Sequence, residues 1–114
     1  MPRISHFWKN HNAHLVDFGR VNRAALSSLP ALVQEWLPDG RRRGSEWVVR
    51  NPRRNDRNRG SFSINLKNGK WADFAVDVKG GDPISLAAFL FGTSQADAAR
   101  AIAVTLGVDW RVRR

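Results

Sequence analysis

The sequence predicts an α+β fold in which a small antiparallel sheet is flanked by two N-terminal and two C-terminal helices. Apolar and polar residues alternate over residues 61–66, which is typical of a half-buried strand. The dipeptide Asn68-Gly69 then predicts a tight type I′ turn, which returns the chain into a second strand at residues 71–74. An apolar run at residues 84–91 should lie on this sheet as a helix, because an isolated hairpin is not stable in water.

The N-terminal half contains signals for two helices and one further strand. Apolar residues recur at helical spacing over residues 17–29, and Pro30 should end this helix and open a second one at residues 31–36. Residues 38–40 read Pro-Asp-Gly, which is a strong turn signal. The Trp-Val-Val run at residues 47–49 is then a candidate for a third strand, upstream of the hairpin.

The C-terminal part contains the start and stop signals of two more helices. Asp82 can cap the third helix, and Pro83 suits its first turn, where a missing N–H is harmless. Thr93 or Ser94 is the expected cap of the fourth helix, whose apolar stripe runs to Leu106 and which Gly107 ends. The sequence shows no internal repeat or low-complexity tract.

We expect one domain with one modest core, because 114 residues leave little room for a second. Residues 1–16 read as an irregular arm, residues 17–110 as the domain and residues 111–114 as a basic tail. The chain has no cysteine, which excludes disulfides, thiolate chemistry and cysteine-ligated zinc. It also shows neither a signal-peptide pattern nor a run of about 20 apolar residues, so we expect a cytoplasmic protein with no membrane partner.

The net charge of +9 is concentrated in one segment. Residues 41–59 hold eight arginines against Glu46 and Asp56, which gives +6 of the total. Such an excess predicts attraction to a polyanion, most often nucleic acid. Guanidinium groups make bidentate phosphate contacts and stack on bases, and each phosphate that they neutralise releases counterions. The arginines of this segment, all candidate binding residues, are Arg41, Arg42, Arg43, Arg50, Arg53, Arg54, Arg57 and Arg59.

Three further residues are candidates for the same site. Asn55 lies within the arginine-rich segment and offers an amide for contact with bases. Trp71 stands beside basic residues, as base-stacking side chains do in single-strand sites. Lys79 precedes a glycine pair and a helix start, where backbone N–H groups can hold a phosphate, although the capping Asp82 places a carboxylate there. The alternative is a solvated surface whose charge only aids solubility, with Trp71 in the core.

The order of motifs along residues 46–108 resembles a known family. Asn51-Pro52, a polar loop and the Gly-Ser-Phe-Ser-Ile run at residues 60–64 come first. Residues 71–77 and a Gly-Asp-Pro-Ile helix start follow, and residues 94–108 close the pattern. This order is similar to the N-terminal zinc-ribbon domain of bacterial, phage and plasmid DNA primases and primase–helicase proteins. The resemblance implies zinc-ribbon-like hairpins and a role beside a priming enzyme.

The chain departs from this family at the metal. The positions that correspond to the four zinc ligands hold Asn51, Arg54, Phe74 and Asp77. A phenyl ring donates no electron pair and a guanidinium carries a fixed positive charge, whereas a structural zinc site needs four nitrogen or sulfur ligands. We therefore expect a metal-free form without cofactor, in which packing of Trp71, Phe74 and Phe62 replaces the zinc.

In the family that the chain resembles, this module contacts the single-stranded template and regulates the catalytic core, but does not form the phosphodiester bond. The resemblance therefore implies a non-catalytic nucleic-acid-binding module, with single-stranded DNA as its partner, during replication or priming of a mobile element. The alternative is a protein-interaction module that docks a primase, a helicase or a host defence protein.

Other chemistries have weaker signals. His11 and His14 have a spacing that could share a metal, but no cysteine or acidic residue stands nearby, so a polar arm is the preferred interpretation. Asp73 and Asp77 are the only close carboxylate pair that could hold divalent ions for nucleotidyl transfer. The sequence has no nucleophile–base motif, P-loop or dinucleotide fingerprint, and we expect no enzymatic activity.

Overall fold

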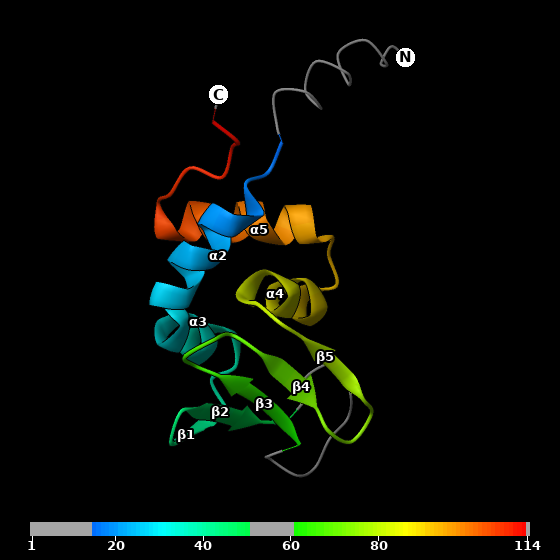
Figure 1. The fold of residues 1–114 in the computed structure, drawn as a ribbon. Helices are drawn as coiled ribbons and strands as arrows, with labels where there is room; N and C mark the ends of the chain where they lie inside the picture. The colour runs from blue at the N-terminus through cyan, green and yellow to red at the C-terminus, as the bar shows by residue number, and fades with distance from the viewer. Residues whose placement is uncertain (1–14, 51–60, 114) are drawn as a thin grey trace.

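The computed structural model of the chain describes residues 15–50 and 61–113. Within these residues, four helices stack on one side of a five-stranded antiparallel sheet (Figure 1). The helices are α2 (Phe18–Ser27), α3 (Leu29–Trp36), α4 (Pro83–Phe91) and α5 (Gln95–Leu106). The strands are β1 (Arg41–Arg43), β2 (Glu46–Val49), β3 (Phe62–Asn65), β4 (Trp71–Asp73) and β5 (Val78–Gly80). The predicted α+β class, with two helices before the sheet and two after it, is confirmed.

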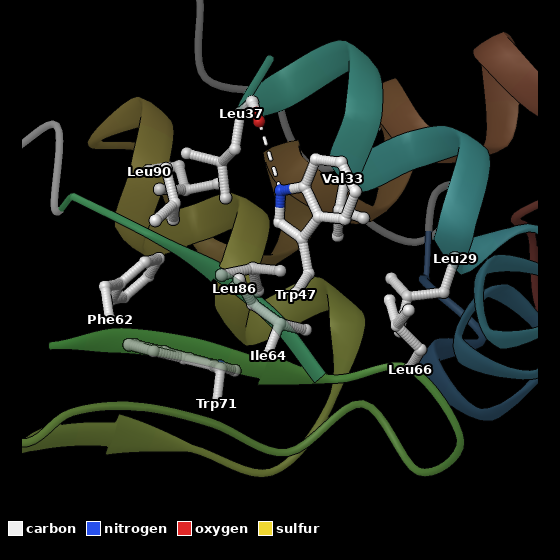
Figure 2. Close-up of a cluster of buried hydrophobic side chains, with 11 residues drawn as sticks. Leu29, Val33, Leu37, Trp47, Phe62, Ile64, Leu66, Trp71, Leu86 and Leu90 are labelled. Atoms are coloured by element: carbon white, nitrogen blue, oxygen red, sulfur yellow. Dashed lines mark hydrogen bonds between the residues drawn. The ribbon is translucent and has the colours of Figure 1, made fainter. Parts of the chain in front are cut away.

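The sheet is a meander in which each strand pairs with the next one in sequence, in the order β1-β2-β3-β4-β5. Trp47 of β2 lies opposite Ile64 of β3, which in turn lies opposite Trp71 of β4. These three side chains point toward α3 and α4, where they form the floor of the core (Figure 2). The register therefore decides which residues are buried and which face away from the helices.

Two of the strands were not expected from the sequence. The triple arginine forms the edge strand β1, whose charged side chains are exposed, as is common for edges that must not pair with other chains. The glycine at position 80 belongs to β5 and lies opposite Trp71. A Cβ atom at Gly80 would lie 2.4 Å from Nε1 of Trp71, so this strand position accepts only glycine.

The turn between β3 and β4 differs from the predicted type I′ turn. Gly69 has a φ of +79°, but the only non-glycine residue with positive φ in the described part of the chain is Asp77, so Asn68 does not adopt the required conformation. Instead, Oδ1 of Asn65 accepts hydrogen bonds from the backbone N–H groups of Lys67 and Asn68, at 2.8 and 3.1 Å. This Asx-type arrangement makes a longer loop, which brings Leu66 into the core.

The core has two parts that share α4. One cluster lies between the sheet, α3 and α4, and includes Phe62, Leu86 and Leu90 (Figure 2). The other lies between α2, α4 and α5, and includes Ile84 and Ala87. Because α4 is buried on both sides, it is apolar nearly all round rather than amphipathic. This helix therefore joins the sheet to the α2–α5 pair.

The aromatic packing that was expected in place of zinc is partly wrong. Phe62, Trp71 and Phe89 form a compact group, with ring centroids 5.0 to 6.0 Å apart. Phe74 was expected in this group, but its side chain is 76% exposed. The reason is strand alternation: Trp71 and Asp73 point inward from β4, so the next residue points outward.

The two ends of the described chain meet beside the helices. Val16 and Arg111 form an antiparallel bridge, and the Asp17 N–H donates to the Trp110 carbonyl at 2.8 Å. The Val112 N–H also donates to the Leu15 carbonyl at 2.9 Å, so the pairing reaches two residues beyond each of the two expected domain boundaries, at residues 17 and 110. Within the described residues, we find no helix with both the length and the apolar character needed to cross a bilayer.

Candidate nucleic-acid interface

The face of the sheet that points away from the helices is the candidate interface, and we call it the outer face. Cross-strand partners lie on the same side of a sheet, and residues alternate between sides along each strand. The register therefore assigns a set of strand residues to the outer face. These are Arg41, Arg43, Glu46, Val48, Ser63, Asn65, Ala72 and Lys79.

Basic side chains lie along both edges of the outer face. Arg41 and Arg43 project from β1, and Lys79 projects from β5 at the opposite edge. Neighbouring strands are about 4.8 Å apart, so these two edges are separated by roughly 19 Å. All three side chains are exposed, and the ion pairs of the described residues involve other arginines, Arg20, Arg100 and Arg111. The edges can therefore contact an external anion.

The three consecutive arginines do not act as one cluster. Arg42 lies opposite Trp47, whose side chain enters the core, so Arg42 belongs to the helix-facing side of the sheet. Its Nε atom donates a hydrogen bond to the Gly44 carbonyl at 3.1 Å. Of the three predicted residues, the structure thus brings Arg41 and Arg43 to the outer face and places Arg42 on the other side.

A shallow hollow of about 290 Å³ lies in the outer face, across β2, β3, β4 and β5. Small residues form its floor, because Ser63 of β3 and Ala72 of β4 lie opposite each other. Lys70, which directly precedes β4, and Lys79 also line it. Lysines at the border of such a hollow can bind phosphates. The small side chains of its floor leave room for a planar group such as a base.

Phe74 also lines the hollow, and sequence reasoning missed its role. It was assigned to the core, whereas its ring is 76% exposed at the end of β4. The ladder continues to this residue, since its N–H donates to the Ser61 carbonyl at 2.8 Å. An exposed aromatic ring on a basic sheet face is the arrangement on which bases stack in single-strand sites. The alternation that starts at Trp71 is the sequence signal that could have identified it.

Trp71 was a candidate for base stacking, and this expectation is wrong. Its side chain is only 5% exposed, and its ring packs against Phe62 and Phe89. The indole N–H donates to Oγ of Ser85 in α4, at 2.9 Å. Trp71 therefore holds the sheet against α4.

The remaining candidates fall into two groups. Arg50 is exposed and directly follows β2. Five candidates lie outside the described residues, and so do the zinc-ligand positions 51 and 54. These five are Arg53, Arg54, Asn55, Arg57 and Arg59.

The phosphate site considered at the start of α4 does not form as expected. Oδ1 of Asp82 accepts the N–H of Ser85 at 2.8 Å, and the Ser85 side chain completes a capping box. Oδ1 of Asn22 from α2 accepts the N–H of Ile84 at 3.0 Å. Side-chain oxygens of the protein thus already accept hydrogen bonds from these N–H groups. Lys79 contributes to the outer face instead.

The possible metal residues serve a turn. Asp73 is fully buried, and its Oδ1 accepts the Ala75 N–H at 2.9 Å. Asp77 has a φ of +56° and closes the same turn through its N–H to the Asp73 carbonyl. In residues 15–50 and 61–113, no three His, Cys, Asp or Glu side chains gather as a metal site would require. His11 and His14 lie outside this part of the chain.

Comparison of the chain with protein-family models, with curated proteins and with solved structures found no match. The geometry and charge of the outer face are therefore the features of this chain that bear on its function.

Proposed function

We propose that this protein is a non-catalytic nucleic-acid-binding module that contacts single-stranded DNA through the outer face of its sheet. The observation that carries the proposal is the arrangement of charge on that face. Lys70 and Lys79 line a hollow that also has an exposed aromatic ring, and Arg41 and Arg43 lie on the same face of the sheet at its β1 edge. Basic side chains that follow a backbone, with an aromatic ring for the bases, are what single-strand binding requires.

The resemblance to primase zinc-ribbon domains supplies the setting of the proposal. In that family the module contacts the template strand for a separate catalytic core. We therefore place the protein in the cytoplasm, in the replication or priming of a mobile element, next to a primase or helicase. Its own contribution is to bind the strand, without forming or breaking a bond.

The test is a fluorescence-anisotropy titration of a thymidine oligonucleotide of about 15 nucleotides, with salt varied from about 50 to 200 mM. Each phosphate contact on a single strand contributes about 0.7 to the slope of log affinity against log salt. Reversing both Arg41 and Arg43 to Glu should therefore lower affinity and reduce the slope by about 1.4, because two contacts are lost.

Arg42→Glu is the matched control for this experiment. It makes the same charge change in the same strand, but its side chain lies on the helix-facing side of the sheet. We expect Arg42→Glu to reduce affinity less than either Arg41→Glu or Arg43→Glu. Affinity that does not depend on salt, or equal losses for all three variants, would contradict binding through the outer face.

A second candidate function, docking of a primase, helicase or host defence protein, is favoured by an apolar groove. The groove holds about 140 Å³ and is lined by side chains of α3, α4 and α5, including Trp36, Phe91 and Ile102. The Phe91 side chain is 54% exposed, although its ring packs against Trp36 in a T-shaped arrangement with the ring centroids 5.9 Å apart. Weak oligonucleotide binding, with a stable protein complex that Phe91→Ala abolishes, would favour this function.

A further inference from the structure

The hollow in the outer face contains a carboxylate, Glu46, among basic neighbours. Glu46 lies opposite Asn65 of β3 and opposite Arg43 of β1. Its two oxygens are held separately: Oγ of Ser63 donates to Oε1, and Nδ2 of Asn65 donates to Oε2 at 3.1 Å. The Asn65 amide is also fixed through its oxygen, which accepts hydrogen bonds from two backbone N–H groups of the β3–β4 turn. The carboxylate is therefore fixed in position by uncharged donors.

This carboxylate is placed to accept further hydrogen bonds. A carboxylate oxygen has about two lone-pair positions, and a single protein donor occupies one of them on each oxygen of Glu46. Within the described residues, no basic side chain lies within salt-bridge distance of it, even though Arg43 is its cross-strand partner. Glu46 is half-buried and lines the hollow, so a ligand that enters can reach it.

An anionic group in the middle of a basic face separates two kinds of ligand group. It repels phosphate, which is attracted to the lysines and arginines at the edges instead. It attracts N–H groups, which the bases of a nucleic acid present on their Watson–Crick edges. The arrangement thus directs the backbone of a strand to the edges of the sheet and a base to the centre.

Guanine and thymine differ in how well they match this centre. Guanine presents a ring N–H and an adjacent amino group, two parallel donors for the two oxygens of one carboxylate, as an arginine does. Its O6 is an acceptor that a lysine can contact, and Lys70 and Lys79 line the same hollow. Thymine presents two carbonyl oxygens on either side of its single N–H, and a carboxylate repels these oxygens.

We propose that the hollow is a base-reading pocket that prefers guanine, with Glu46 accepting hydrogen bonds from its Watson–Crick edge and Phe74 stacking on its face. Ser63 and Asn65 are positioning residues that orient the carboxylate. The inference rests on the proposed function, because it assigns a base preference to the same single-strand interface.

The test uses three labelled oligonucleotides in the same anisotropy assay. One is all thymidine, the second carries a single central guanine, and the third carries inosine, which lacks the amino group, at that position. A good bidentate contact discriminates between bases by about 1–3 kcal/mol, so we expect roughly tenfold tighter binding of the guanine strand than of the thymidine strand. The inosine strand should fall between the two, since it keeps the ring N–H and O6.

The Glu46→Gln variant tests whether Glu46 is the residue that contacts the base. The amide keeps the shape of the side chain but loses one acceptor oxygen, so the guanine preference should fall to less than about threefold, with no loss of affinity for thymidine. Glu35→Gln is the matched control, because it removes the same charge from an exposed position on α3, on the other side of the sheet. It should keep the full preference. Ser63→Ala should reduce the preference partly.

The outcomes separate this inference from the proposed function. Salt-dependent binding of all three strands with equal affinity would overturn the guanine pocket and leave single-strand binding intact. No binding of any strand would overturn both. A preference that persists in a folded Glu46→Gln variant would overturn the role of Glu46. If that variant does not fold, as judged by circular dichroism, the guanine, inosine and thymidine comparison on the unaltered protein decides alone.

Discussion

At the scale of single residues, two tryptophan–glycine contacts fix the sheet to its surroundings. The Trp47 indole donates to the Leu37 carbonyl at 3.1 Å (Figure 2). A Cβ atom at Gly40 would lie 2.1 Å from Nε1 of the same indole. The Trp71 indole makes the corresponding contact with Gly80 and bonds Ser85 of α4. Each large ring lies where a side chain would otherwise be. These contacts join β2 to the segment that follows α3, and β4 to β5 and α4.

The neighbouring glycines at positions 80 and 81 offer a direct test of this packing. In Gly80→Ala the new methyl group would meet Trp71 and Ser85 at 2.4 to 2.6 Å, so we expect a loss of stability of about 1–3 kcal/mol from overpacking. In Gly81→Ala the methyl group would meet nothing within 4 Å, and stability should change by less than about 1 kcal/mol. Urea denaturation measures both. Equal losses would show that the indole contact is not what excludes a side chain.

Phe74 and Phe91 form a second matched pair, for binding rather than stability. Both rings are exposed, by 76% and 54%, but Phe74 borders the hollow and Phe91 lies in the groove between the helices. If a base stacks on it, Phe74→Ala should weaken oligonucleotide binding by about 1–3 kcal/mol. Phe91→Ala should leave this affinity unchanged. Anisotropy titrations measure both, and an unaltered affinity in Phe74→Ala would contradict base stacking on this ring.

These aromatic residues also show where sequence reasoning reached its limit. Neighbouring charges suggested that Trp71 is exposed, and a motif position suggested that Phe74 is packed, but the structure reverses the two. The strand period places Trp71 and Phe74 on opposite sides of the sheet. The pairing of β4 with the buried residues Phe62 and Ile64 then decides that Trp71 is the one that faces the helices. Composition around a residue does not decide its side of a sheet.

At the scale of elements, α2 supplies a hydrogen-bond acceptor to the N-terminus of α4. The Ile84 N–H is one of the N-terminal donors that a helix leaves without an internal partner, and Asn22 of α2 accepts it across 62 residues of sequence. Ile84 is fully buried, and a buried backbone N–H group needs an acceptor. The hydrogen bond therefore fixes the position of α4, which packs on the sheet.

We expect Asn22→Ala to cost about 1–3 kcal/mol, because it leaves the Ile84 N–H buried without an acceptor. Asn22→Asp keeps an acceptor oxygen in the same place and should retain most of the stability. Arg23→Ala, at the adjacent exposed position of α2, should change stability by less than about 0.5 kcal/mol. Thermal melts followed by circular dichroism compare the three, and a neutral Asn22→Ala would remove the proposed role of this contact.

The elements that the sequence predicted are those with strong local signals. All four helices were expected, and their caps at Asp82, Ser94 and Gly107 are in place. Strands β1 and β5 were missed because each is three residues long and, apart from Val78, contains only arginine, lysine and glycine, which are not enriched in strands. Both form only because a neighbouring strand offers its backbone for pairing, which local sequence does not reveal.

At the scale of the whole molecule, the fold separates charge by sheet face. The sequence indicated a basic segment, and the prediction of its partner stays a prediction. The sequence could not show that Arg41 and Arg43 share a face with Lys70 and Lys79, which lie far along the chain. It also could not show that Arg42 lies apart from them. Sidedness follows from strand register, which is a property of long-range pairing.

The packing of the core and of the β4–β5 turn also leads to a prediction of how the protein responds to chelators. The resemblance would assign positions 74 and 77, in and beside the β4–β5 turn, to zinc. The turn is instead closed by the N–H groups of Val76 and Asp77, which donate to the Asp73 carbonyl at 3.3 and 3.0 Å. Structural zinc contributes folding energy directly, so its removal unfolds proteins that depend on it. We expect the melting temperature to be the same with and without an excess of EDTA. A fall of several degrees, with zinc detected by elemental analysis, would contradict the metal-free fold.

The bridge between Val16 and Arg111 has a practical consequence for anyone who handles this molecule. Both strands of the bridge lie beside the helices, on the side of the molecule opposite the sheet (Figure 1). A tether or dye attached at Leu15 or Val112, the two paired residues beside the bridge, therefore starts on the side of the molecule opposite the outer face. Surface-immobilised measurements can use either attachment position, and the two should report the same affinity.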